Sequence, residues 1–80
     1  MQQDVAWQVI KVAFRCGGEL QTLLKYLKDN SDDADYERYA KGVAAAVATV
    51  STELINRALA DRPELEKRIE EDLEKYGRIT

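Results

Sequence analysis

The sequence predicts an all-α chain: a long helical hairpin followed by a shorter amphipathic C-terminal helix, in one domain that spans residues 1–80. Its apolar residues recur at intervals of three and four, which is the period of a helix face rather than of a strand. Residues that break helices are scarce, with one proline and four glycines among the 80. A chain of this length forms a single core, so we expect one domain.

The first helix is expected over residues 3–28. Gly17 and Gly18 stand in its middle, where each costs about 1 kcal/mol relative to alanine. They mark a kink or the close approach of another backbone, and a break into two shorter helices is the alternative. An apolar stripe advances along this helix in steps of three and four, and we expect it to be buried: Val5, Val9, Val12, Cys16, Leu20, Leu23 and Leu27.

The second helix is predicted over residues 33–60. Residues 29–35 are acidic and rich in turn formers, which predicts the connection between the two helices. The aspartates of this segment also suit a helix start, where acids cap free backbone N–H groups and meet the positive end of the helix dipole. A heptad spacing typical of a bundle seam follows, at Tyr36, Ala40, Val43, Val47, Val50 and Leu54.

A third helix is predicted to begin at residues 61–64. Asp61 and Glu64 resemble a capping box, and Pro63 is tolerated in a first helical turn. The helix should end near Tyr76, with Gly77 as the left-handed residue that closes it. Charged residues fill most of its surface, and its narrow apolar stripe consists of Leu65, Ile69, Leu73 and Tyr76.

The charge distribution argues against two classes of partner. Residues 1–28 carry four Lys/Arg and two Asp/Glu (+2), residues 29–60 three and six (−3), and residues 61–80 five and seven (−2). No segment has the basic cluster with which proteins bind phosphates, so we expect no nucleic-acid partner. The longest uncharged run, residues 42–52, is far shorter than the roughly 20 residues that span a bilayer, so we expect no membrane.

Side chains for catalysis or metal binding are missing from the sequence. There is no histidine and a single cysteine, Cys16, so neither an internal disulfide nor a Cys/His zinc site can form. Activation of that thiol would need a base, and Arg15 is its one neighbouring cation. We therefore expect no enzyme, metal, cofactor or small-molecule substrate. The lone thiol, and an N-terminal segment unlike a signal peptide, predict a cytoplasmic protein.

Two acidic patterns invite a metal site, and each has a simpler explanation. An EF-hand beginning at Asp29 would need glycine at position 34 and glutamate at position 40, where the chain has Ala34 and Ala40. Those aspartates are better explained as a turn and a helix cap. In the third helix, Glu66 and Glu70 stand one turn apart, but cations alternate with these acids, which favours a solvated face.

The sequence predicts self-association, because the chain has more apolar surface than it can cover. Residues 42–52 form three helical turns without a charge, and a helix of that kind belongs in an interior. The third helix offers too few apolar side chains to shield this segment and the aromatic flank of the first helix. The alternative is a monomeric three-helix bundle. The predicted interface of a homodimer consists of Trp7, Ile10, Phe14, Ala45, Ala48, Thr52, Ile55 and Leu59.

These features together predict a non-enzymatic protein–protein interaction module that forms a homodimeric helical bundle and possesses a groove or an acidic helix for a second protein. Under this hypothesis, Ala48→Glu dissociates the dimer. The alternative is a small acidic inhibitor, such as an antitoxin or immunity-like protein, that covers a basic site on its target. Its complex would weaken steeply with salt, whereas apolar self-association would not.

Overall fold

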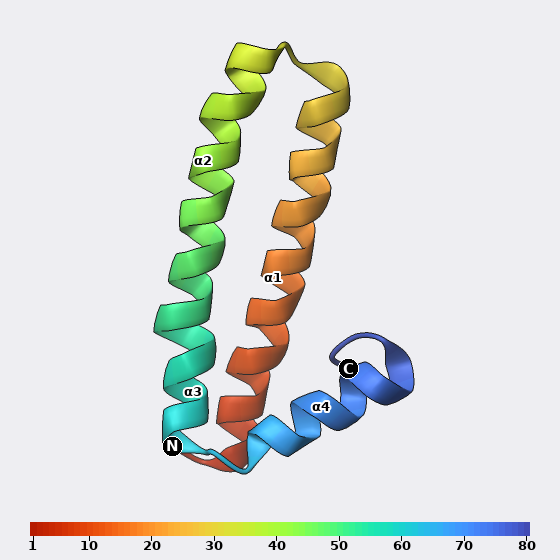
Figure 1. The fold of residues 1–80 in the computed structure, drawn as a ribbon. Helices are drawn as coiled ribbons and strands as arrows, with labels where there is room; N and C mark the ends of the chain where they lie inside the picture. Colours follow the sequence, from red (N-terminus) through yellow and green to blue (C-terminus); the bar gives the residue numbers. More distant parts are fainter.

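The computed structural model describes all 80 residues and confirms the all-α fold (Figure 1). Helix α1 (Gln3–Asn30) runs the length of the molecule and is followed by a two-residue turn. The chain returns through α2 (Asp33–Val50), a π-helical turn η1 (Ser51–Ile55) and α3 (Asn56–Asp61), which together form one continuous rod. Helix α4 (Leu65–Tyr76) then turns away from the hairpin at its base and extends past α1.

The tip of the hairpin is tighter than expected, with Ser31 and Asp32 as its only non-helical residues. The Asp32 carboxylate accepts a hydrogen bond from the backbone N–H of Asp35 at 2.7 Å, which confirms an aspartate cap at the start of α2. At the end of α1, both the backbone N–H and the hydroxyl of Ser31 donate to the carbonyl of Leu27. These local bonds satisfy helix-terminal groups without a longer loop.

Helix α1 continues unbroken through Gly17 and Gly18, so the alternative of two shorter helices is wrong. A Cβ atom built on either glycine meets nothing within 4 Å. No part of this chain therefore approaches the glycines closely enough to require them.

We expect Gly18→Ala to stabilise the isolated chain by about 0.5–1 kcal/mol, because alanine loses less backbone entropy in a helix. A thermal melt followed by circular dichroism should show a midpoint several degrees higher. The matched control is Gly77→Ala, since Gly77 has φ +71° in open space and alanine is strained at that angle. A lower midpoint for Gly18→Ala would contradict the open environment at that position.

The π turn changes which residues of the second rod face α1. The backbone N–H of Asn56 donates to the carbonyl of Ser51, five residues earlier, so the turn holds one more residue than an α-helical turn. As a result the residue facing inward after Val50 is the half-buried Ile55, five positions on. The heptad spacing placed Leu54 in the seam, and this is wrong: Leu54 is 44% exposed.

The buried line of α1 is also displaced by one residue from the predicted stripe. In the predicted stripe, Val5, Val12 and Leu23 are 44–52% exposed and Cys16 is exposed, so the expectation of a buried stripe is wrong for these four residues. The orientation of α1 about its axis instead buries the flank that contains Trp7 and Ile10. These side chains are larger than the valines of the predicted stripe, so their burial removes more apolar area from water. The residues that face the second rod are Ala6, Ile10, Ala13, Gly17, Leu20, Leu24 and Leu27.

Helix α4 starts later than the capping-box pattern predicted. Asp61 is the last residue of α3, and α4 begins at Leu65 with no side-chain cap. The reason is Pro63, because the residue before a proline avoids helical angles; Arg62 accordingly has φ −138° and ψ 76°. The C-terminal expectation is confirmed, since α4 ends at Tyr76 and Gly77 is left-handed.

A small core joins α4 to the base of the hairpin. The Arg68 guanidinium lies over the Trp7 ring, 4.0 Å from its centroid, so the ring is covered by a cation as well as by apolar side chains. After α4, both the backbone N–H and the hydroxyl of Thr80 donate to the Asp72 carboxylate, which holds the C-terminus against α4. The buried residues of this cluster are Ala6, Trp7, Ile10, Ala58, Leu65 and Ile69.

The chain leaves most of its surface in water. Only 7 of 80 residues are buried, and the accessible surface is 5918 Å². A compact monomer of 9.1 kDa would expose about 4,900 Å². The radius of gyration is 14.7 Å, whereas about 11.6 Å is typical of a compact domain of this length. The fold is therefore an open hairpin with a core at one end only.

Candidate interaction surface

The structure distributes the predicted interface residues over three environments. Trp7 and Ile10 are buried in the core, at 6% and 0% exposure. Phe14, Ile55 and Leu59 are half-buried near the base of the hairpin. The remaining three residues lie exposed on the second rod: Ala45, Ala48 and Thr52.

The expectation that the aromatic flank of α1 needs a second protein is wrong for Trp7 and Ile10. Leu65 and Ile69 of α4 belong to the same buried cluster as these two residues. Leu65 and Ile69 are enough to cover this flank because α4 lies at the base of the hairpin, beside the large side chains of Trp7 and Ile10. A partner can therefore reach little of Trp7 or Ile10 in the folded chain.

A small-residue face runs along the outer side of the second rod. Residues 42–52 contain no charged side chain, and most of them are exposed. Their accessible side chains are small, which permits close approach of another helix but offers little apolar area per residue. The members of this small-residue face are Ala45, Ala48 and Thr52, all exposed.

The rod from Asp33 to Asp61 is also long and apolar enough, by length and composition, to cross a membrane. Its most apolar 18-residue window has a mean hydropathy of 1.2, and 11% of that window is buried. One such helix is weak evidence, because the buried core helix of a soluble protein and a signal sequence meet the same criterion. Glu53 and Arg57 form an ion pair on the surface of this rod, at positions that a membrane-spanning segment would have to desolvate.

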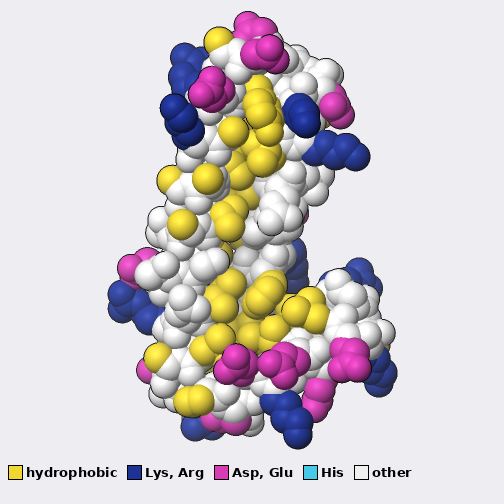
Figure 2. Space-filling view, viewed as in Figure 1, with side chains coloured by type: hydrophobic (Ala, Val, Ile, Leu, Met, Phe, Trp, Pro, Cys, Tyr) yellow, Lys and Arg dark blue, Asp and Glu magenta, His cyan; other side chains and the backbone are white.

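An open groove of about 740 Å³ lies between the middle of α1, the π turn and the C-terminal tail. Phe14 and Gly18 contribute from α1, Ser51 and Ile55 from η1, and Ile79 from the tail. Figure 2 shows apolar side chains as a strip between the two long helices, which widens where α4 meets α1. The groove marks the side of the hairpin on which α4 lies.

A second apolar surface occupies the opposite side of the hairpin. On α1 and on the second rod, which run antiparallel, the residue that follows one facing the other helix points into the groove. Phe14, Gly18 and Ser51 are examples. The residue before an inward position therefore points to the side away from α4. We call this surface the distal face, and its apolar members are Val5, Val9, Val12, Cys16 and Leu23 of α1 with Tyr39, Ala46 and Leu54 of the second rod.

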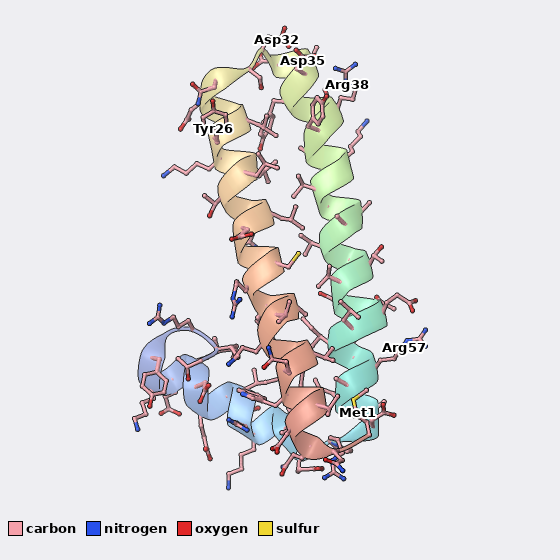
Figure 3. All side chains as sticks on the ribbon, turned by 180° about the vertical axis from the view of Figure 1, so that it is seen from behind. Met1, Tyr26, Asp32, Asp35, Arg38 and Arg57 are labelled. Carbon is pink, nitrogen blue, oxygen red and sulfur yellow. The ribbon has the colours of Figure 1, made fainter.

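The distal face is exposed and has few charges. Near the base, Val5 and Val12 of α1 are 52% and 45% exposed, whereas Val9 between them is half-buried and packs against the core. Glu19 is the one charged residue that interrupts the stripe on α1. Figure 3 shows the charged residues Asp32, Asp35 and Arg38 gathered at the tip of the hairpin, with Arg57 at the edge of the second rod.

The sequence contains a signal for this face, the apolar stripe of α1, but a stripe of this kind is equally typical of a core-facing side. Val5, Val9, Val12, Cys16 and Leu23 of this stripe recur at helical spacing because they lie on one side of a helix, but periodicity does not tell which protein covers that side. No group of three or more His, Cys, Asp or Glu side chains could hold a metal ion. Comparison of the chain with protein-family models, curated proteins and solved structures finds no match.

Proposed function

We propose that this chain is a non-enzymatic helical interaction module that acts as a homodimer in the cytoplasm. The observation that carries the proposal is the excess of exposed surface. The chain exposes 5918 Å², about 1,000 Å² more than a compact monomer of its mass. A standard protein–protein interface buries about 800 Å² on each partner, so one interface of ordinary size would remove the excess.

The size of the core supports the same proposal. A chain of 80 residues seldom obtains more than about 3–5 kcal/mol from its own core, and small domains usually add a disulfide, a metal or a partner. Cys16 is free and exposed, and the chain holds no metal-binding cluster. Association with a partner is the remaining source of stability, and a second copy is the commonest partner. The exposed thiol fits a reducing compartment, which supports the cytoplasmic location.

The alternative of an acidic inhibitor has less support. The acids of α4 are interleaved with cations, and the ion pairs of the chain are exposed ones between near neighbours, as for Arg38 and Asp35 at 3.0 Å. Such a mixed surface does not give the strong negative field that steers an inhibitor to a basic site.

Sedimentation equilibrium over a range of concentrations tests self-association. We expect the apparent mass to rise from 9.1 kDa towards twice that value as concentration increases. Because the buried surface is apolar, the midpoint of this rise should change little between low and high salt. A well-folded species of one-copy mass at the highest concentration would contradict the proposal, and a steep salt dependence would favour the inhibitor.

A further inference from the structure

We propose that the distal face, rather than the small-residue face of the second rod, is where a second copy of this chain docks. The inference rests on the proposed homodimer and specifies its geometry: two hairpins stack through their distal faces into a four-helix bundle, and each α4 stays on the outside. It differs from the interface expected from sequence, which centred on Ala48.

The first argument is the kind of side chain that is left exposed. Along the distal face, Val5, Val12, Leu23 and Leu54 are each between 44% and 52% exposed. Burial of branched aliphatic side chains removes more apolar area per residue than burial of alanine, so this face gains more from a partner than the small-residue face does. An exposed row of this length on a monomer marks a surface that another protein covers.

The second argument is the π turn. In a regular helix Leu54 would follow Val50 by one turn and would face α1. The extra residue of η1 instead gives that position to Ile55 and turns Leu54 outward, onto the distal face. A π turn is rare and is frequently found at functional sites. Here its effect is to enlarge the apolar surface opposite α4.

The third argument identifies the occupant as another copy of the chain. A two-fold axis parallel to the hairpin joins the same face of both copies and places α1 of one copy against the second rod of the other, so that their apolar rows meet twice. The rods so paired also run antiparallel, which suits their dipoles. The surface excess of about 1,000 Å² per chain matches what each copy of such a dimer would bury.

Two matched variants test the geometry by sedimentation of the full chain. Val12→Glu introduces a charge into the distal face, and Ala48→Glu introduces the same charge into the small-residue face. Both sites are exposed and helical, and glutamate is a good helix former, so each monomer keeps its fold. Circular dichroism confirms this for each variant. We expect Val12→Glu to raise the dissociation constant at least about 100-fold and Ala48→Glu to leave it within about threefold.

Cys16 supplies an independent readout without any substitution, since it is the only thiol and it lies on the distal face. Its alkylation by N-ethylmaleimide should be fast in dilute wild-type protein and at least about tenfold slower at concentrations where the dimer forms. In Val12→Glu the rate should stay fast at every concentration, and in Ala48→Glu it should slow as in the wild type.

The results separate this inference from the proposed function. One outcome is that the wild type dimerises, that Ala48→Glu dissociates the dimer and that Val12→Glu does not. This result would overturn the distal face as the interface and leave self-association in place. A rate of Cys16 alkylation that is independent of concentration in a proven dimer overturns it as well. If the wild type stays monomeric, the proposed function fails, and the inference fails with it.

Discussion

Trp7→Ala should abolish cooperative folding of the isolated chain at room temperature. Trp7 is 6% exposed, belongs to the buried cluster and has the Arg68 guanidinium over its ring. Truncation of a buried tryptophan costs about 3–5 kcal/mol, which equals the whole stability that a core of this size supplies. Urea unfolding followed by circular dichroism at low protein concentration should show a shallow transition with no folded baseline.

The matched control is Tyr39→Ala, which removes an aromatic side chain of similar size from a position that is 55% exposed. We expect that variant to lose less than about 1 kcal/mol and to keep a sigmoidal transition. If Trp7→Ala also kept a sigmoidal transition with a similar midpoint, the cluster at the base would not be the core. The residual helix content of Trp7→Ala should increase with protein concentration if association stabilises the hairpin.

Leu65→Ala should release α4 from the hairpin and destabilise the chain by about 2–5 kcal/mol. Leu65 is 1% exposed and is one of only two large side chains that are fully buried. It fixes the first turn of α4, which no side-chain cap stabilises. Without it, α4 keeps only Ile69 as a buried contact with the core.

The single tryptophan reports this change directly, because Trp7 lies under α4. Its fluorescence emission should shift to longer wavelength in Leu65→Ala as water reaches the ring. Leu73→Ala is the control on the same helix: Leu73 is 44% exposed, so its truncation should cost less than about 1 kcal/mol and leave the emission unchanged. Equal emission in both leucine variants would show that α4 does not depend on Leu65 for its position.

Both predictions follow from the position of the buried core, which lies at one end of the molecule. All the residues of the buried cluster lie at the base of the hairpin, where α1, α3 and α4 meet. Towards the tip the two rods contact each other through half-buried side chains only, such as Leu24 and Val43. We therefore expect the tip half of the hairpin to depend on a partner for its stability, whereas the base half folds around Trp7.

Local features of this chain could be predicted from sequence because they depend on neighbouring residues. The helical periods gave the two rods and α4, the aspartates near Asp32 predicted a capped start of α2, and Gly77 predicted the end of α4. Each of these follows from hydrogen bonds or backbone angles within one or two turns. Asp61 resembles a helix cap in sequence but is the last residue of α3, because capping patterns and helix ends use the same residue types.

The candidate site depended on tertiary structure for the opposite reason. Helix α1 carries two adjacent apolar flanks, and either could have faced inward. The packing of α4 determines which flank is buried, because α4 covers Trp7 and Ile10. Val5 and Val12, on the other flank, remain in water. The residues of the π turn, which exposes Leu54, fit the helical pattern of the sequence and do not mark the turn. Sequence alone thus determined which surfaces of this chain are apolar and helical, because that depends on spacing. Only the packed structure decided which of them the chain covers itself, because that depends on how all the helices compete for the same few buried contacts.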